Sequence, residues 1–330
     1  MFDSQGLLVL SASEIESVFD VDTAIESQRV AFRELGLGNA KLPARLLIDG
    51  PHESVSFCYA ARVSDETGSV CKFGSVVPGN ASRGLPSVSA LIAALDPVTG
   101  APAAILDGTS VTTIRTAAAS AVAAENLVNE GSARLAVLGS GVQAEAHVHA
   151  LAKVLPLAAF RIWSRNPGRR ESLARRLSEA SDVDVQATSS AEQAVTGADV
   201  VVGCTTSAQP VFDLAWVKPG ATVISVGSYA AGLCEVPYDL ARTADAVVVD
   251  DVSTALEHAG PVVRAIEQNE IQQSDLIPLG EVVAGLRQAR RRPEDLVFYN
   301  SVGLGVQDAA ATWAVVTAAR QRGLGRTVSL

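Results

Sequence analysis

The chain contains 330 residues, of which 48% are hydrophobic and 19% are charged, so it can bury a sizeable core and is not intrinsically disordered. This length predicts about two domains. The formal net charge is −10, which argues against general nucleic-acid binding because that activity needs a basic surface.

Neither a membrane segment nor a metal site is expected. No apolar run approaches the ~20 residues that a transmembrane helix needs. Residues 1–5 lack the basic start of a secretory signal, so we expect a cytoplasmic protein. The four histidines show no metal-ligand spacing. The cysteines form no Cys-x-x-Cys pair and are expected to be reduced thiols: Cys58, Cys71, Cys204 and Cys234.

The first part of the chain predicts two helices followed by a mostly antiparallel sheet. Ser11-Ala-Ser-Glu14 is a capping-box pattern that opens the first helix, and residues 22–35 form the second. An alanine-rich helix is expected over residues 113–127, where the character of the chain changes and where we place the junction to a second domain. Five strands are expected between these helices: residues 46–48, 55–61, 69–77, 88–95 and 103–106.

From residue 133 onward strands and helices alternate, which predicts an α/β domain with a parallel sheet and helices on both faces. Several strands are near-continuous β-branched runs, as expected for strands buried on both faces. A helix over residues 306–322 closes the chain. The expected strands are the following: residues 135–138, 160–163, 183–187, 199–203, 222–226, 246–250 and 293–299.

A glycine turn joins the first of these strands to a helix expected over residues 142–154. Gly139 permits a tight turn, Gly141 lets the backbone approach a pyrophosphate, and Ala144 lets helix and strand pack closely. The helix N-terminus would hold the phosphates. The alternative is an ordinary strand–turn–helix, but the strand–helix alternation that follows favours a dinucleotide-binding unit.

The end of the second strand of this domain favours NADP over NAD. NAD-binding units usually carry an acid about 20 residues after the glycines, whereas here the strand ends in Ser164-Arg165-Asn166. Six arginines, including Arg169, lie in residues 161–176 against the single acid Glu171. Arginine suits a 2′-phosphate. The alternative is a solvated basic helix face.

Three cations occupy unusual places in the first part of the chain. Arg45 precedes a strand, Lys72 lies inside one, and Arg115 begins the alanine-rich helix. Such charges are costly unless they are paired, and a substrate carboxylate would be a suitable partner. Each of them alone is equally consistent with a surface or ion-paired side chain.

Short motifs occur in a specific order along the chain. Together they resemble the ornithine cyclodeaminase/mu-crystallin family over nearly the whole length. The matching segments are the following: Pro43-Ala-Arg45, Cys71-Lys72-Phe73, Pro78-Gly-Asn80, Gly84-Leu-Pro86, Leu95-Asp-Pro-Val-Thr-Gly100, Thr112-Thr-Ile-Arg-Thr-Ala-Ala118, Gly139-Ser-Gly-Val-Gln-Ala144, Cys204-Thr-Thr206 and Asn300-Ser-Val-Gly303.

The resemblance implies an α/β protein of two domains. Residues 1–114 with 306–330 would form an α+β substrate-binding and dimerisation domain completed by the C-terminal helix, and residues 115–305 would form a Rossmann domain. It also implies that Arg45, Arg115 and Lys72 hold the substrate carboxylate and its α-nitrogen beside the nicotinamide. The cofactor would be lined by residues at matching positions and their motif neighbours: Ser87, Arg115, Thr116, Gly139, Gly141, Val142, Gln143, Cys204, Thr205, Thr206, Ser301, Val302 and Gly303.

One segment departs from the family pattern. Cyclodeaminases and the alanine dehydrogenase of the family carry an aspartate in a G-D-x-P-G-x-x-E segment. Counting back from Glu235 places Tyr229 at that position. A tyrosine, with an ordinary pKa of about 10, is a poor base at neutral pH but can donate a hydrogen bond. This difference lowers the expectation of a cyclodeaminase and favours reduction.

The sequence thus leads to three hypotheses. The first is an NADPH-dependent reductase of a C=N bond next to a carboxylate, acting on a small imino acid as a homodimer, with Lys72 handling the proton and Tyr229 a weaker candidate. The second is an ornithine or lysine cyclodeaminase that recycles bound NAD. The third is a non-catalytic NADPH-dependent ligand-binding protein of the mu-crystallin kind.

Overall fold

The computed structural model describes residues 6–329, and the side chains of residues 81 and 82 are not described. Residues 1–5, which bear on the expected lack of a secretory signal, lie outside this range. The chain divides into two compact units, each described here by itself. Unit 1 runs up to Arg115 and resumes at Leu304, and unit 2 is Thr116–Gly303.

Unit 1 is built on a seven-stranded sheet of order β15-β1-β6-β5-β4-β3-β2. Strands β2 to β6 form an antiparallel meander, as predicted, while β1 pairs parallel to β6 and antiparallel to β15. The bounds are β1 (Leu7–Leu10), β2 (Leu46–Asp49), β3 (Val55–Ala61), β4 (Val70–Val76), β5 (Val88–Leu95), β6 (Pro102–Asp107) and β15 (Arg326–Val328).

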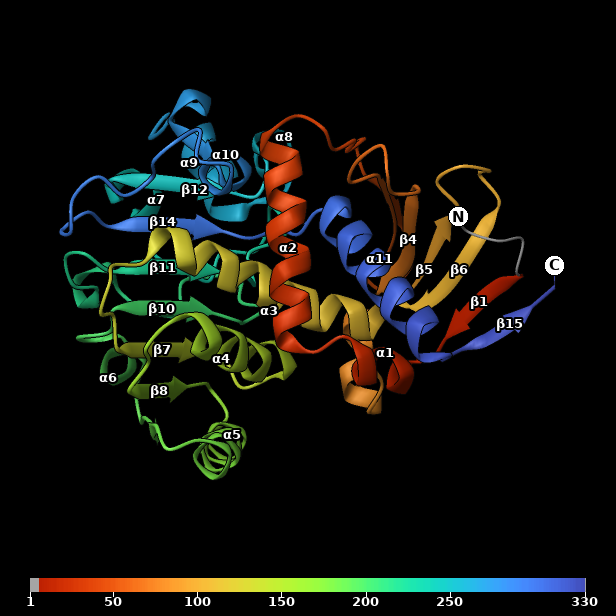
Figure 1. Cartoon of the computed structure of the whole chain (residues 1–330). Coiled ribbons are helices and arrows are strands. Elements are labelled where there is room, and N and C mark those ends of the chain that lie inside the picture. The colour runs from red at the N-terminus through yellow and green to blue at the C-terminus, as the bar shows by residue number, and fades with distance from the viewer. Residues whose placement is uncertain (1–5, 330) are drawn as a thin grey trace. The chain divides into compact units, whose positions relative to one another are not determined.

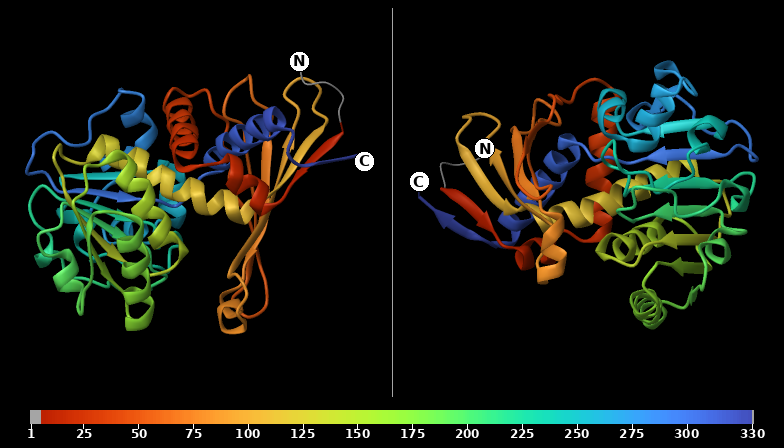
Figure 2. Two further views of the ribbon diagram at one scale, coloured as in Figure 1. Left: turned by 60° about the horizontal axis from the view of Figure 1, so that its bottom comes forward. Right: turned by 180° about the vertical axis from the view of Figure 1, so that it is seen from behind.

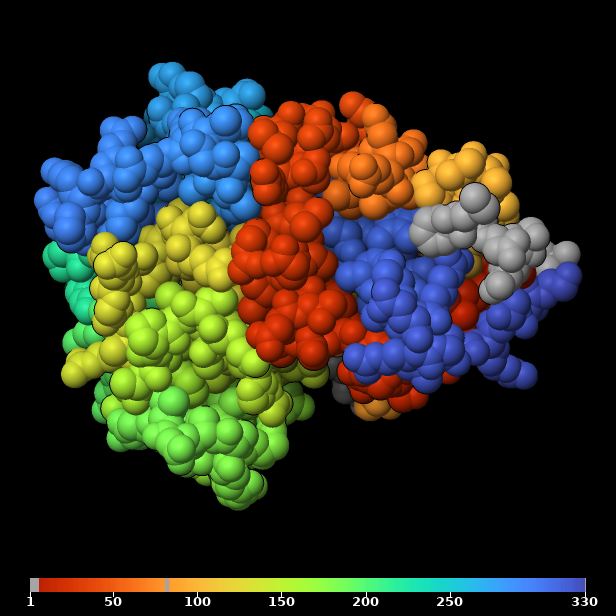
Figure 3. All heavy atoms as spheres, in the orientation of Figure 1, coloured from red at the N-terminus to blue at the C-terminus, as the bar shows by residue number. Residues whose placement is uncertain are grey.

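Three α-helices belong wholly to unit 1: α1 (Ala12–Val18), α2 (Val21–Gly36) and α11 (Gly305–Arg322). Ser11 and Glu14 form the predicted capping box of α1, since the Glu14 carboxylate accepts from the Ser11 amide at 2.9 Å. Residues 305–313 of α11 are all buried and its last three residues are exposed; the helix packs on α2 and on strands β3 and β4. Figure 3 shows α2 and α11 side by side at the surface of this unit.

Helix α3 (Gly108–Leu127) begins in unit 1 and ends in unit 2. It starts five residues before the predicted helix over residues 113–127. The reason is that Asp107 accepts a hydrogen bond from the Ser110 amide at 2.7 Å and thereby caps the first turn.

Unit 2 is an α/β unit with an eight-stranded sheet, entirely parallel, of order β13-β12-β14-β11-β10-β7-β8-β9. This Rossmann-type arrangement confirms the predicted fold class. Its strands are β7 (Arg134–Leu138), β8 (Ala159–Trp163), β9 (Asp184–Ala187), β10 (Val200–Gly203), β11 (Thr222–Ser225), β12 (Ala246–Val249), β13 (Leu276–Pro278) and β14 (Val297–Asn300).

Helices cover the sheet of unit 2. One face packs against a core to which α6, α7, α8 and α9 contribute, and Figure 1 shows α4 and the second half of α3 crossing in front of β7, β10 and β11. Figure 2 shows the same sheet from behind. The bounds are α4 (Val142–Val154), α5 (Pro167–Ala180), α6 (Ala191–Val195), α7 (Leu240–Thr243), α8 (Val252–His258), α9 (Gly260–Glu267) and α10 (Leu279–Val283).

The strand predicted over residues 293–299 starts only at Val297. The segment before it is held as a loop, because the carboxylate of Asp295 accepts from the amides of Arg291 and Arg292 at 2.9 Å each. Within residues 6–329, no helix combines the length and apolarity needed to cross a bilayer.

Candidate functional site

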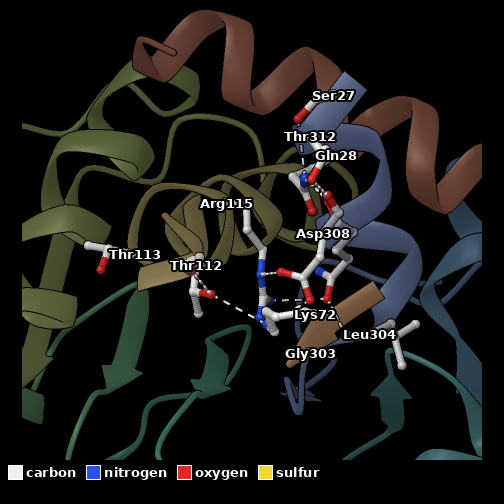
Figure 4. Close-up of polar contacts among 12 residues, drawn as sticks. Ser27, Gln28, Lys72, Thr112, Thr113, Arg115, Gly303, Leu304, Asp308 and Thr312 are labelled. Carbon is white, nitrogen blue, oxygen red and sulfur yellow. Dashed lines mark hydrogen bonds and ion pairs between the residues drawn. The ribbon is translucent and has the colours of Figure 1, made fainter. Parts of the chain in front are cut away.

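Unit 1 holds a cluster of buried charges, drawn in Figure 4. Lys72 comes from β4, Arg115 from α3 and Asp308 from α11, and their side chains are only 3%, 5% and 1% exposed. Lys72 Nζ lies 2.7 Å from Asp308 Oδ2, and Arg115 Nε lies 3.0 Å from Asp308 Oδ1. One carboxylate thus bridges two cations, each bound to a different oxygen.

Neighbouring polar groups fix this cluster. Gln307 Oε1 accepts from Arg115 Nη1 at 3.3 Å and from the Leu304 amide at 2.6 Å. The backbone oxygen of Gln307 accepts from Gln28 Nε2 of α2 at 3.1 Å. On the other side, Lys72 Nζ donates to Thr112 Oγ1 at 3.3 Å. The first turn of α11 is therefore tied to both cations and to α2.

Burial and pairing set the charge states of the cluster. Burial lowers the pKa of Lys72 to about 8, against the opposing attraction of Asp308. Burial alone would raise the pKa of Asp308, but the charges of Arg115 and Lys72 hold it below its ordinary value. At neutral pH Asp308 is therefore ionised, and Lys72 is a cation that loses its proton as the pH rises through about 8.

Two aromatic rings of β3 border the cluster. Phe57 and Tyr59 stack with ring centroids 4.8 Å apart. The Arg45 guanidinium lies 4.8 Å from the centroid of the Tyr59 ring, and Lys72 Nζ lies 5.2 Å from the same centroid. Burial raises the pKa of Tyr59, so its phenol is neutral at physiological pH.

The structure therefore brings the three predicted cations together around Tyr59 and Asp308. Of the two alternatives for Lys72 and Arg115, the structure shows the ion pair, since Asp308 of the chain itself pairs with both. Sequence reasoning missed Asp308 and Tyr59. The signal that could have identified Asp308 is an acid in the first turn of an otherwise alanine-rich and apolar helix.

Three other predicted site residues, Tyr229, Ser87 and Thr116, are not part of this cluster's hydrogen-bond network in unit 1. Tyr229 belongs to unit 2, follows the end of β11 and is half-buried. Ser87, expected near the cofactor, belongs to unit 1, where its carbonyl oxygen accepts from the Val77 amide at 2.7 Å just before β5. Thr116 is the first residue of unit 2 and is buried in α3.

The glycine turn of unit 2 has the geometry of a phosphate cradle. Gly139 has φ +132°, and a Cβ there would lie 2.7 Å from the carbonyl oxygen of Cys204, so no other residue fits without strain. Gly141 is the N-cap of α4, with no atom within 4 Å of a Cβ placed there. Val142 is 68% exposed, and Gln143 Oε1 is buried without a hydrogen-bond partner in the described part of the chain. These residues fit a dinucleotide.

The end of β8 lies next to this turn. Ser140 Oγ donates to Ser164 Oγ at 2.9 Å, and Ser164 Oγ donates to the carbonyl oxygen of Asn166 at 3.1 Å. Asn166 caps α5, accepting from the Arg169 amide at 3.0 Å. Arg165 and Arg169 are exposed. Other arginines of the segment bind within the chain instead: Arg161 to Asp184, Arg170 to the Ser164 carbonyl and Arg176 to Glu145.

A buried glutamate organises the loops after β10 and β11. Glu235 is 0% exposed, and its carboxylate accepts four hydrogen bonds. Thr205 donates from its amide at 2.7 Å and its hydroxyl at 2.8 Å, while Ser225 Oγ and the Gly227 amide donate at 2.9 and 2.7 Å. The loop of Cys204, Thr205 and Thr206 is thereby fixed beside the glycine turn, because β7 and β10 are adjacent parallel strands.

A second buried carboxylate, Asp250, holds the loop after β14. It accepts from the amides of Val302 and Gly303 at 2.7 and 2.6 Å and from the Tyr299 hydroxyl. The adjacent Ser301 is also buried. The loops after β7, β8, β10 and β14 all leave the carboxyl ends of parallel strands, the edge at which such sheets bind ligands. In the described residues no group of three or more His, Cys, Asp or Glu side chains is arranged to hold a metal ion.

A parallel sheet whose first strand leads through a glycine turn into a helix is the arrangement of dinucleotide-binding α/β proteins. The family profile of ornithine cyclodeaminase/mu-crystallin matches residues 6–323. The chain belongs to this family, as its motifs predicted.

Relatives with known names span nearly the whole chain. Alanine dehydrogenase of Archaeoglobus fulgidus is 30% identical over 323 residues, covering 97% of this chain and 98% of that protein. Ketimine reductase mu-crystallin of Mus musculus is 31% identical over 276 residues, covering 83% of this chain and 84% of that protein.

Several solved structures are similar to this chain over nearly its whole length. Delta(1)-pyrroline-2-carboxylate reductase of Thermococcus litoralis, in complex with NADH and L-proline, has a TM-score of 0.94 and 30% identity, covering 98% of this chain and 100% of that one. A dimeric archaeal alanine dehydrogenase with bound NAD has a TM-score of 0.93 and 28% identity, covering 98% and 99%. A lysine cyclodeaminase has a TM-score of 0.87 and 28% identity, covering 98% and 96%.

Proposed function

We propose that the protein is an NADPH-dependent reductase of a C=N bond next to a carboxylate, giving an amino acid or an N-substituted amino acid. The observation that carries the proposal is the buried cluster of Lys72, Arg115 and Asp308 with Arg45 nearby, in a chain that also has a dinucleotide-type glycine turn. The named relatives that reduce ketimines and pyrroline-2-carboxylate support this reaction class.

The residues of unit 2 support a nicotinamide dinucleotide as the cofactor. Its pyrophosphate would lie on the free amides at the start of α4, beside Gly139 and Gly141. Thr205 and Ser301 belong to loops that Glu235 and Asp250 hold rigid, so they are suited to contact it. When bound, NADPH supplies the hydride for the C=N carbon.

The residues of unit 1 bind the substrate and move the proton. Arg45 attracts the carboxylate through the paired donors of a guanidinium, and Arg115, whose Nε and Nη1 already bind Asp308 and Gln307, attracts it by its charge. Lys72 donates a proton to the nitrogen that becomes an amine, which its lowered pKa of about 8 favours near neutral pH. Asp308 positions Lys72 and Arg115 by binding both. Tyr229 is a weaker candidate for proton transfer.

NADPH oxidation tests this function. The purified protein is mixed with NADPH and a panel of cyclic imino acids or pairs of a 2-oxo acid and an amine. We expect oxidation of NADPH with at least one compound, and we expect Lys72→Met to abolish it. No oxidation with any member of the panel would refute the reductase.

The second candidate is a cyclodeaminase, supported by the similarity to a solved lysine cyclodeaminase. It would release ammonia from ornithine or lysine without net change of the cofactor. Analysis of products with no added reductant separates the two reactions. The absence of an aspartate at the position of Tyr229 favours the reductase.

We also propose a preference for NADPH over NADH. Arg165 and Arg169 are exposed beside Ser164, and the strand end carries no acid that would repel a 2′-phosphate. We expect Arg165→Ala to weaken NADPH binding by roughly 10-fold or more while leaving NADH binding nearly unchanged. Titration of both cofactors checks this, with Arg175→Ala as the exposed-arginine control. Equal losses for the two cofactors would contradict the assignment.

A further inference from the structure

A hydrogen-bonded histidine joins helices α3 and α4 inside unit 2. His147 of α4 and Ser120 of α3 are both 0% exposed. His147 Nε2 lies 3.0 Å from Ser120 Oγ, and its Nδ1 lies 2.7 Å from the carbonyl oxygen of Gln143 in the first turn of α4. Both ring nitrogens are therefore engaged, one within the helix and one across to its neighbour.

The protonation state of this ring follows from its partners. A carbonyl oxygen can only accept, so Nδ1 carries the hydrogen that is donated to Gln143. Burial lowers the pKa of His147 to about 4, so the ring is neutral at physiological pH and Nε2 carries no hydrogen. The Ser120 hydroxyl is therefore the donor to Nε2. The two bonds run from α3 through the imidazole to the first turn of α4, and turning the ring over would break both.

The helix turn that His147 holds is the one expected to meet the cofactor. Gln143 lies two residues after Gly141, the N-cap of α4. The Oε1 atom of Gln143 is buried without a hydrogen-bond partner among residues 6–329. A buried acceptor left unpaired is costly, and a bound dinucleotide can supply the missing donor from a ribose hydroxyl. This turn is therefore prepared for a ligand.

Ser120 is a polar exception in an apolar stretch of α3. The other members of residues 117–124 are alanines and one valine, all of them buried. Apolar contacts are non-directional, so such a surface lets a neighbouring helix shift along it, whereas a hydrogen bond requires one geometry. Thr116, which is also expected to line the cofactor, lies one turn before Ser120 on the same face of α3. The bond to His147 therefore sets the position of the first turn of α4 relative to Thr116.

We propose that His147 is a positioning residue for the cofactor. Oriented by Ser120 and acting through Gln143, it holds the first turn of α4 in the arrangement that receives the pyrophosphate and a ribose hydroxyl of a nicotinamide dinucleotide. Because its ring is fully buried and both ring nitrogens are engaged, His147 acts without touching the cofactor itself. The inference rests on the cofactor site proposed above.

Equilibrium binding of NADPH to folded variants tests this role without turnover. His147→Phe keeps a buried ring but removes both hydrogen bonds, and we expect the Kd for NADPH to rise roughly 10-fold. The matched control is His149→Phe, because His149 lies on the same helix but is exposed, and its Kd should equal that of the wild type. Fluorescence titration measures both. An unchanged Kd in folded His147→Phe would overturn the proposal.

A double variant separates positioning from stability. His147→Phe alone leaves the Ser120 hydroxyl buried without its acceptor, whereas adding Ser120→Ala makes the contact apolar on both sides and should return the thermal unfolding midpoint most of the way to the wild-type value. The Kd should stay raised roughly 10-fold, because no hydrogen bond holds the turn. Recovery of the Kd together with the stability would contradict a positioning role. If neither protein folds, Ser120→Ala alone carries the binding measurement, and an unchanged Kd there has the same meaning.

The direction of the two hydrogen bonds is itself observable. The chain has only four histidines, so NMR of protein with isotope-labelled histidine can resolve their tautomers. We expect His147 to be the neutral Nδ1–H form between about pH 6 and 8. A protonated ring or the Nε2–H form would reverse or break the bond to Ser120 and would refute the inference.

The outcome is separable from that of the reductase proposal. If NADPH binding depends on His147 as expected but no imine is reduced, the reaction is wrong and the positioning role stands. If imines are reduced but His147→Phe binds NADPH as tightly as the wild type, the positioning role alone fails. A wild-type protein that binds no dinucleotide would refute both.

Discussion

The lowered pKa of Lys72 predicts a pH dependence of carboxylate binding. A lysine carries its charge below its pKa, so with a pKa of about 8 Lys72 loses its charge as the pH rises through 8. We expect the affinity for tetrahydrofuran-2-carboxylate, which does not titrate in this range, to fall roughly 10-fold per pH unit above 8. Calorimetric titration between pH 6 and 10 measures it.

The Lys72→Arg variant is the control for that measurement. Arginine stays charged across the whole range, so the decline above pH 8 should disappear. The same decline in both proteins would show that another group is responsible.

Asp308 should matter for stability as much as for binding. Removing its charge by Asp308→Asn leaves Lys72 and Arg115 buried without their carboxylate, which costs about 3 kcal/mol or more. Chemical denaturation measures the change. The matched control is Asp239→Asn, which removes an exposed pair with Arg242 at 3.9 Å and should cost less than about 1 kcal/mol. Equal losses would contradict the bridging role of Asp308.

Among individual residues, the sequence predicted only part of the candidate site. The sequence predicted Arg45, Lys72 and Arg115, because a cation inside or just before a strand, or at the start of an apolar helix, is costly unless it is paired. The sequence did not predict Tyr59, because aromatic residues are common in strands and carry no signal of a site. The pairing of Asp308 with Lys72 joins residues far apart in the chain, and such a contact is fixed by tertiary packing that no local pattern encodes.

The loops at the carboxyl edge of the unit 2 sheet depend on buried acids rather than on the loop residues themselves. In Glu235→Gln, an amide with a single acceptor oxygen replaces a carboxylate that accepts four hydrogen bonds. We expect the KM for NADPH to rise roughly 10-fold, with kcat restored at saturating cofactor. Steady-state kinetics over a wide NADPH range check this.

A loss of fold alone would not produce that split between KM and kcat. Glu257→Gln, at a glutamate whose side chain is 70% exposed, should leave both constants unchanged. A drop in kcat that excess NADPH does not restore would show that Glu235 serves the fold rather than the cofactor loops.

Elements with strong patterns were predicted well and weak ones were not. The β-branched runs of β10, β11 and β12 and the capping box of α1 lie where the sequence placed them. Strands β1, β13 and β15 were not predicted: β13 and β15 span only three residues, too few for a periodic pattern, and β1 is a short apolar run without the β-branched character of β10 to β12. They are strands because β1 pairs with β6, β13 pairs with β12 and β15 pairs with β1.

The sheet of unit 1 carries an apolar row that favours a homodimer. Leu46, Phe73 and Leu91 are aligned across β2 to β5 and are 65%, 50% and 45% exposed. Exposed apolar patches of this kind mark protein interfaces. We expect Phe73→Glu to convert a dimer to a monomer in analytical ultracentrifugation, because a buried unpaired carboxylate opposes association.

Leu286→Glu changes an equally apolar residue, 63% exposed but in unit 2, and should leave the dimer intact. A wild-type monomer at micromolar concentration would contradict the expected homodimer directly.

Unit 1 is discontinuous in the chain, and this has a consequence for synthesis. On the ribosome Lys72 and Arg115 emerge early, but Asp308 follows Arg115 only 193 residues later, after the whole of unit 2. Until α11 appears, the meander of β2 to β6 lacks both the helix that covers it and the counter-charge of its two cations. We therefore expect a nascent chain stalled before α11 to have a protease-resistant unit 2 and a protease-sensitive unit 1, so that translation order makes the substrate site the last part of the protein to form.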